Sequence, residues 1–527
     1  MHRCHSTLSW SSGRRHSSEV EVWGRSKPAT LNSTNNGLVP PIYKFMWIQG
    51  GFQSTMYKTI VPLPRSLSNP HLFKAPGSTD QYLDKLDLKV GGPNSSDMAA
   101  KLRPLFEAAV REKKIPAIGA FIVDSEGNFR LKETFGTTNM DDPNAAPFDA
   151  DTTTRLFSCS KLITTIAALQ LLEQGKLSLS DPVEKYVPRI SKIQVLRSFT
   201  TNDKGQPQPI FRSPKSKPTI HQLMTHTSGF SYDFFDKPTL QWRLSTGDVP
   251  AKYNDRGNWE DFETPFVADP GTKYVYGTGT DWLGLVVQQI SGLSLPEYVE
   301  KAISQPLGMT NTRPVLKDPQ EKRLIVHLKG NDGKLKANPA LKNAENPQVY
   351  GGGGCFYSTM NDFAKLLSTL LNGGTSPHTN RTILKPETIR DYLFKDQLPP
   401  QVDKSGLGEI RTSIPAVSNE GSFLPSCPLT QRGWSCALLI NHQDLPRGRK
   451  RGSGAWAGLG NLYYWIDPTE KIAGMVVSAV FPFFDPTVLK LFDQLERVAY
   501  AHEPAGPEDD GMSNFSVGTE RSPAPKI

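Results

Sequence analysis

Predicted strands lie near both ends of the central part of the chain, and predicted helices occupy the long stretch between them. Apolar runs bounded by turn residues indicate strands over residues 115–124 and 129–135. Three more are predicted over 434–441, 461–467 and 472–479, the last two joined by a hairpin turn. One antiparallel sheet built from both chain ends satisfies this order. We therefore predict an α/β (α+β) fold, in which terminal helices flank an antiparallel sheet that carries a large, mostly helical insertion.

The two helices expected to flank the sheet are amphipathic. Residues 97–113 carry apolar side chains, including Leu102 and Phe106, on one face. Residues 485–501 repeat this pattern near the far end of the chain. Each helix therefore has an apolar face that a sheet can bury.

The chain divides by composition into three parts. Residues 1–88 are rich in Ser, Arg, His and Asn and lack apolar periodicity, so we expect an extension of low structure or an over-long gene model. A transit peptide is the alternative, against which Glu19 and Glu21 count. The folded domain is expected over 89–502. A disordered tail rich in Pro, Gly, Ser and acidic residues is expected over 503–527.

The charge and hydropathy of the chain argue against nucleic-acid and membrane partners. The net charge is +8, but the basic residues are mostly dispersed. The exception is the Arg-Gly-Arg-Lys-Arg run at 447–451, for which a solvated loop and a site for an anionic partner are both open. No apolar run approaches the roughly 18 residues that a membrane helix needs. We expect a monomer.

The cysteines and histidines point to neither disulfides nor a metal site. Five cysteines form no Cys-x-x-Cys pair, and no secretory apolar segment is present, so we expect free thiols in the reducing cytoplasm. His221, His226 and His442 share no ligand spacing, so no metal and no cofactor are expected. His226 ends a short predicted helix, and we interpret it as a buried structural imidazole rather than a base.

A Ser-x-x-Lys sequence opens a predicted helix that ends near Gly175. Residues three apart share one face of a helix, so the amine of Lys161 is expected close to the hydroxyl of Ser158. A lysine amine takes a proton from serine when burial and neighbouring charges favour its neutral form. The sequence therefore offers a nucleophile and its base, although a solvated lysine at a helix start is the alternative.

Four glycines at 351–354 precede a capped helix predicted to begin near residue 359. A phosphate-binding loop is one explanation, but the Gly-Lys-Thr sequence and the preceding strand are missing. Backbone crowding near an active site explains the glycines better.

Three spaced motifs carry a resemblance to a known family. They stand in that family's order: Ser158-x-x-Lys161, Tyr276-Gly277-Thr278 and Trp456-Ala457-Gly458. Together they resemble the serine β-lactamase/penicillin-binding superfamily, class C-like, over about residues 95–500. Thr278 stands in place of the usual Asn, and Trp456 in place of the cation or imidazole that holds a substrate carboxylate. These departures resemble the esterase and transesterase branch. Within it, four features resemble fungal acyltransferases of lovastatin-type polyketide pathways: Arg155, Tyr276-Gly277, Asp281-Trp282 and residues 461–467.

The resemblance implies roles for particular residues. Ser158 would attack an acyl carbonyl, while Lys161 and Tyr276 share the duty of general base. The oxyanion hole would use the backbone N–H groups of Ser158 and Leu459. The residues expected to bind substrate are Arg155, Trp456, Gly458, Tyr464 and Trp465. A structural ion pair for Arg155, and ordinary strand packing for Tyr464 and Trp465, are the alternatives.

The resemblance also implies a function. The expected enzyme moves an acyl group from a thioester or ester donor to a hydroxyl of a small secondary metabolite. An acyl carrier protein is one candidate for the partner that carries the donor. A carboxylesterase or β-lactamase-like hydrolase is the first alternative. A non-catalytic scaffold on the same fold is the second.

Overall fold

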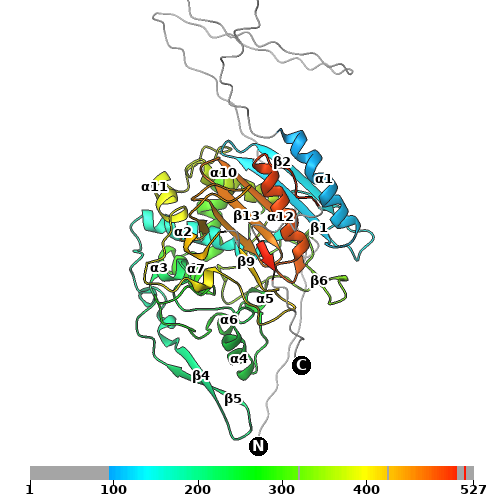
Figure 1. Cartoon of the computed structure of the whole chain (residues 1–527). Coiled ribbons are helices and arrows are strands. Elements are labelled where there is room, and N and C mark those ends of the chain that lie inside the picture. The colour runs from blue at the N-terminus through cyan, green and yellow to red at the C-terminus, as the bar shows by residue number, and fades with distance from the viewer. Residues whose placement is uncertain (1–93, 319–320, 424–426, 507–514, 518–527) are drawn as a thin grey trace, which may run out of the picture. The chain divides into compact units, whose positions relative to one another are not determined.

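The computed structural model describes residues 94–318, 321–423 and 427–506, and the backbone of 515–517. Within these ranges the largest sheet has seven strands in the order β10-β11-β12-β13-β14-β1-β2, and all neighbours are antiparallel (Figure 1). Their bounds are β1 (Ala117–Asp124), β2 (Phe129–Gly136), β10 (Arg432–Trp434), β11 (Leu439–Asn441), β12 (Gly454–Gly458), β13 (Leu462–Asp467) and β14 (Ile472–Val477). The early hairpin β1–β2 joins the late strands through β14, which confirms the predicted fold class.

Helices cover both faces of this sheet. The terminal helices α1 (Ser95–Arg111) and α12 (Pro486–Ala499) pack against each other, with α1 on β2 and α12 on β14. Helix α10 (Met360–Leu371) packs against β1, β13 and β14. Because successive residues of a strand point to opposite faces, Tyr464 faces Phe363 of α10 while Trp465 faces Phe492 of α12. The two helices therefore lie on opposite sides of β13.

Cap residues fix where the flanking helices begin. The Asp485 carboxylate accepts hydrogen bonds from the amides of Thr487 and Val488 at the start of α12. The Thr359 hydroxyl does the same for the amide of Asp362 at the start of α10. Both starts match the boundaries expected from the sequence.

The insertion between β2 and β10 is mostly helical, as predicted. Its helices are α2 (Ser160–Glu173), α3 (Ile220–Met224), α4 (Lys237–Ser245), α5 (Tyr253–Arg256), α6 (Trp259–Phe262), α7 (Gly279–Ser291), α8 (Leu295–Val299), α9 (Gln305–Leu307), α10 and α11 (Pro386–Thr388). Short strands accompany them: β3 (Thr154–Arg155) with β8 (Tyr357–Ser358), the hairpin of β4 (Val195–Thr201) and β5 (Pro207–Arg212), and β6 (His327–Lys329) with β7 (Leu335–Ala337) and β15 (Val480–Phe481). The hairpin β4–β5 was not expected from the sequence.

The strand expected over 434–441 is two strands separated by a turn. The Ser435 hydroxyl accepts hydrogen bonds from the amides of Ala437 and Leu438, at 3.2 and 2.9 Å. A serine side chain that bonds its own backbone in this way offers an alternative to the strand ladder. The single predicted strand is therefore wrong, and β10 and β11 form a hairpin instead.

The basic run at 447–451 is not simply a solvated loop. Arg449 is buried and pairs with the equally buried Glu496 of α12, with Nη2 to Oε2 at 2.6 Å and Nε to Oε1 at 2.8 Å. The run therefore ties the loop before β12 to the terminal helix.

Some expectations fall on residues outside the described ranges. The predicted extension over 1–88 is one of these, as is Cys4. Of the predicted tail, residues 503–506 are described, and Phe515–Val517 form β16, which pairs with β9 (Gly421–Phe423). The four described cysteines are free and buried: Cys159, Cys355, Cys427 and Cys436. None of the described helices is both long and apolar enough to span a membrane.

Candidate active site

Ser158 lies in a sharp turn between a strand and a helix. Strand β3 is followed by a 3-10 turn, Phe157–Cys159, and then directly by α2. Phe157 has a φ of 47°, a left-handed conformation that a bulky residue adopts only where its surroundings hold it. Its ring packs on Phe481 at 5.6 Å between centroids and beneath the Arg155 guanidinium. These contacts fix the turn that presents the Ser158 hydroxyl.

Lys161 lies one helical turn further on, as predicted. Its Nζ is 3.1 Å from Ser158 Oγ, 3.0 Å from the Tyr232 hydroxyl and 2.9 Å from the Gly353 carbonyl oxygen. Only 1% of the residue is exposed. The solvated-lysine alternative is therefore wrong, because the amine is buried against the serine.

Tyr276, expected from a distant segment, reaches the same place. Its ring centroid is 4.8 Å from Lys161 Nζ. Its hydroxyl accepts a hydrogen bond from the indole N–H of Trp456 at 3.0 Å. The phenol therefore stands beside the amine while its oxygen is held by β12.

His226 packs behind Tyr276. The two ring centroids are 4.6 Å apart, and Trp434 closes the other side of the imidazole at 5.2 Å. Burial lowers the pKa of His226 well below 6.5, and Lys161 lowers it further when its amine carries a proton, so the imidazole is neutral. This environment fits the structural role expected for it.

Two further buried residues belong to the site, and the sequence predicted a role for neither, although Asp281 is part of the Asp281-Trp282 match to the fungal acyltransferases. The Tyr232 hydroxyl accepts from Lys161 and donates to Asp281 Oδ2 at 3.4 Å. Burial raises the pKa of Tyr232 well above 10 and the pKa of Asp281 to about 6. Tyr232 lies three residues after Gly229, beyond the end of α3, where no spacing rule indicates a partner for Lys161.

The glycine run at 351–354 wraps around these groups. The Gly353 amide donates to Asp281 Oδ1 at 2.9 Å while its carbonyl accepts from Lys161. A Cβ on Gly353 would lie 2.8 Å from Asp281 Oδ2 and 3.0 Å from Lys161 Nζ. The expected backbone crowding is therefore confirmed.

A cavity of about 390 Å³ opens beside Ser158. Ser158 and Leu459, the two residues expected to form the oxyanion hole, both line it, as does Tyr232. The rest of its wall is largely apolar, including Phe157, Phe234, Tyr253, Leu328, Leu341, Val417 and Phe481. Gly458 does not line the cavity. A Cβ there would lie 2.4 Å from the Leu156 carbonyl oxygen, so this glycine lets β12 approach the serine turn.

Arg155 forms part of the cavity wall and also an ion pair. Its Nη2 lies 2.6 Å from Asp255 Oδ1, and the residue is 6% exposed. Its Nε and Nη1 are buried and have no hydrogen-bond partner among the described residues. Both interpretations of Arg155 thus have support, since it is paired and still has donors to offer.

Three of the aromatic residues expected to bind substrate do not line the cavity. Trp465 is fully buried on the α12 side of the sheet, where its indole N–H donates to the Tyr500 hydroxyl at 3.2 Å. Tyr464 is 1% exposed and packs edge-on against Phe363. The predicted substrate contacts of Trp465 and Tyr464 are wrong, because strand packing accounts for both. Trp456 is buried against Tyr276 and acts on that phenol.

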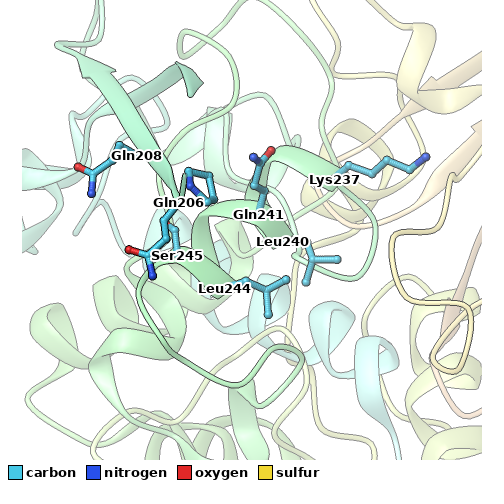
Figure 2. Close-up of a pocket in the computed structure, with 8 residues that line it drawn as sticks. Gln206, Gln208, Lys237, Leu240, Gln241, Leu244 and Ser245 are labelled. Atoms are coloured by element: carbon cyan, nitrogen blue, oxygen red, sulfur yellow. The ribbon is translucent and has the colours of Figure 1, made fainter. Parts of the chain in front are cut away.

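A second hollow, of about 580 Å³, lies between α4 and the turn of the β4–β5 hairpin (Figure 2). Gln206 and Gln208 line one side, and Leu240, Gln241 and Leu244 the other. Its one serine, Ser245, donates its hydroxyl to the Trp242 carbonyl oxygen. This hollow holds no activated nucleophile, so the cavity at Ser158 is the candidate active site. Nor do any three His, Cys, Asp or Glu side chains in the described ranges group so that they could hold a metal ion.

The fold and this site together define a serine-dependent enzyme of acyl chemistry. The chain belongs to the Beta-lactamase family, whose model matches residues 102–495. The monacolin J acid methylbutanoyltransferase of Aspergillus terreus is 28% identical over 78% of this chain and 98% of its own. The lovastatin esterase of Penicillium rubens is 30% identical over 72% and 92%. Unliganded simvastatin synthase from Aspergillus terreus has a TM-score of 0.62 at 26% identity, covering 77% of this chain and 98% of that one. The predicted family and the predicted class, an acyl-transferring enzyme, are confirmed.

Proposed function

We propose that this protein transfers an acyl group from a thioester or ester donor to a hydroxyl of a small secondary metabolite, by way of an acyl-Ser158 intermediate. The observation that carries the proposal is the contact of the buried Lys161 Nζ with the Oγ of Ser158, a residue that lines the cavity. The similarity to a methylbutanoyltransferase and to other fungal acyltransferases supports the choice of reaction.

In the proposed mechanism Ser158 Oγ attacks the acyl carbonyl and its proton passes to Lys161. The backbone N–H groups of Ser158 and Leu459 stabilise the oxyanion, each contributing about 3 kcal/mol in the transition state. Tyr276 protonates the leaving group and then takes the proton of the incoming alcohol. As the alcohol attacks, the bond between the acyl carbon and Ser158 Oγ breaks, and Lys161 returns its proton to that oxygen. The Trp456 N–H supports this second role, because its hydrogen bond to the Tyr276 oxygen is kept when that oxygen carries negative charge.

The wall of the cavity supports a mainly apolar substrate with one polar contact. Apolar side chains dominate its lining, and Arg155 offers two buried N–H groups without partners among the described residues. A guanidinium of this kind suits a carboxylate on the acceptor. The relatives that act on monacolin J acid and on the ML-236A carboxylate by name favour the same substrate chemistry.

Hydrolysis is the second candidate function. The lovastatin esterase relative, at 30% identity, favours it. The same acyl-Ser158 intermediate would then react with water in place of an alcohol.

Donor, assembly and location are also part of the proposal. An acyl carrier protein is the donor that the resemblance to polyketide acyltransferases favours. A monomer is the proposed assembly. Four free, buried cysteines support a cytoplasmic location.

A partition experiment tests the proposed function. The protein is incubated with a methylbutanoyl thioester, and its intact mass is recorded before and after monacolin J acid is added. We expect an acyl adduct that disappears on addition of the alcohol with formation of the ester. Adduct loss to water at an unchanged rate would favour the hydrolase, and no adduct with any thioester or ester donor would refute both. Ser158→Ala is the control, since it removes only the hydroxyl.

A further inference from the structure

We propose that Tyr232 and Asp281 are positioning residues for the amine of Lys161, which aim its lone pair at Ser158 and stabilise the ammonium formed when that serine loses its proton. The inference rests on the proposed function of Ser158 and Lys161 and adds two residues to it.

The contacts of the lysine amine define its orientation. A neutral amine has two N–H bonds and one lone pair. The Gly353 carbonyl oxygen, 2.9 Å from Nζ, can only accept, so it takes one N–H. The Tyr232 oxygen, 3.0 Å away, takes the other if its own proton is directed elsewhere. The remaining direction points at Ser158 Oγ, 3.1 Å away.

Asp281 directs the proton of Tyr232. An ionised carboxylate is only an acceptor, so Tyr232 donates to its Oδ2 at 3.4 Å. The other oxygen, Oδ1, is fixed by the Gly353 amide at 2.9 Å. Gly353 therefore holds the carboxylate with its N–H and the amine with its carbonyl, and Tyr232 closes the ring between them.

The same arrangement stabilises the charge that the reaction creates. As the Ser158 O–H bond breaks, its electron pair forms the bond to the acyl carbon and its proton passes to Lys161. The resulting ammonium is buried. Burying a charge costs free energy unless a nearby negative charge compensates it. Lys161 forms no salt bridge with any carboxylate of the described residues, so the negative charge of Asp281 acts on it across space and through the hydroxyl of Tyr232. Burial keeps the pKa of Tyr232 well above 10, so this phenol holds its proton throughout.

The titration of Asp281 should appear in the pH dependence of the acylation rate. Lys161 from α2, Tyr232 and the Cys355 thiol interact with its charge. Burial raises the pKa of Cys355 far above neutrality, so it stays uncharged. The pKa of Asp281 is about 6. Acylation should therefore slow as pH falls through about 6, because the protonated carboxyl no longer supports the ammonium.

The test uses Tyr232→Phe, Asp281→Asn and the double variant, with p-nitrophenyl butanoate as the acyl donor. The acylation rate constant and KM are measured across pH. We expect each single change to lower the rate constant on the order of 10²-fold with KM nearly unchanged. The double variant should be no slower than the slower single one, because the two residues act as a unit. Asp281→Asn should also remove the part of the acid-side fall in rate that is centred near pH 6.

Tyr274→Phe is the matched control. Its hydroxyl is equally buried and has no hydrogen-bond partner among the described residues, so its loss should leave the rate unchanged. Rates within twofold of the unmodified protein for Tyr232→Phe and Asp281→Asn would overturn the inference. An unchanged fall in rate near pH 6 in Asp281→Asn would also overturn it. If these variants are active while Ser158→Ala is inert, only the positioning role fails. If Ser158→Ala is itself active, the proposed function fails.

Discussion

Trp456 connects the sheet to the site through one hydrogen bond. Its N–H donates to the Tyr276 hydroxyl at 3.0 Å, and its ring packs against that of Tyr276 at 4.8 Å between centroids. Other members of the superfamily are expected to have a cationic side chain at this position, which would bind a substrate carboxylate. A neutral indole instead fixes the orientation of a phenol, so this residue serves the proposed proton transfer rather than substrate binding.

Replacing this indole by a smaller ring isolates the hydrogen bond. Trp456→Phe should lower kcat about fivefold, because a net hydrogen bond contributes about 1 kcal/mol. KM should change little, since Trp456 does not line the cavity. Steady-state kinetics with a thioester donor measure both constants. Trp259→Phe, a change outside the site, is the control, and a rise in KM with kcat intact would contradict this role.

At the scale of single residues, the sequence predicted what local spacing controls. Ser158 and Lys161 are three positions apart on a helical turn, so their contact follows from helix geometry. Tyr276 required the resemblance to a family. The contacts of Tyr232 and Asp281 with this site were missed, because tertiary packing alone brings them to Lys161; Asp281 had entered only as part of a family match. Trp465 was wrongly predicted to bind substrate. It and Tyr464 are neighbours on β13 and so point to opposite faces of the sheet, but the sequence does not tell which face meets the site.

Among elements, the glycine loop at 351–354 holds the site together most closely. It approaches Lys161 and Asp281 so tightly that no side chain fits at Gly353, where a Cβ would lie 2.8 Å from a carboxylate oxygen. Overpacking of a buried position usually costs about 1–3 kcal/mol. The loop is therefore a structural requirement for the buried amine and carboxylate.

Gly353→Ala should lower both stability and activity. We expect the free energy of unfolding to fall by about 1–3 kcal/mol and acylation to slow, because the added methyl group separates the amine from the carboxylate. Urea unfolding and the acylation rate measure the two effects. Gly354→Ala is the milder comparison, since its Cβ first meets the Asn254 amide at 3.1 Å. Equal effects of the two substitutions would argue against crowding at residue 353.

The elements themselves were predictable where their patterns were long. The amphipathic helices α1 and α12 and the hairpins β1–β2 and β13–β14 match the predicted segments within a few residues. The strand expected over 434–441 failed because a serine side chain turns the backbone between β10 and β11. The hairpin β4–β5 was missed because its residues are largely exposed and give no clear alternation.

For the whole molecule, the buried site lowers stability at neutral pH. Burial raises the pKa of Asp281 from 3.8 to about 6. Ionising this carboxyl at neutral pH therefore costs more free energy in the native state than in the unfolded chain. The resulting stabilisation is complete below the unfolded pKa and is lost as pH rises through about 6. Proteins commonly give up stability in this way at functional sites.

Asp281→Asn should remove this pH dependence. Between pH about 4 and about 7 the unmodified protein should lose on the order of 3 kcal/mol relative to the variant. Chemical unfolding of both proteins at several pH values measures the difference. A difference that stays constant with pH would show that Asp281 titrates alike in the folded and unfolded chains.

The overall architecture follows from the order of the elements along the chain. Strands near both ends and helices between them leave an antiparallel sheet as the simplest solution, and β1 does pair with β14 across most of the sequence. The cavity was not predictable in this way, because its walls come from several separate segments of the insertion and the late strands.

The most direct test of the central claim is the site of acylation. The protein is treated with a methylbutanoyl thioester, quenched in acid and digested, and the acylated peptide is sequenced by mass spectrometry. We predict that the acyl group is on Ser158 and that Lys161→Ala carries far less of it in the same time. An acyl group on any other residue, or full labelling of Ser158→Ala, would contradict the account.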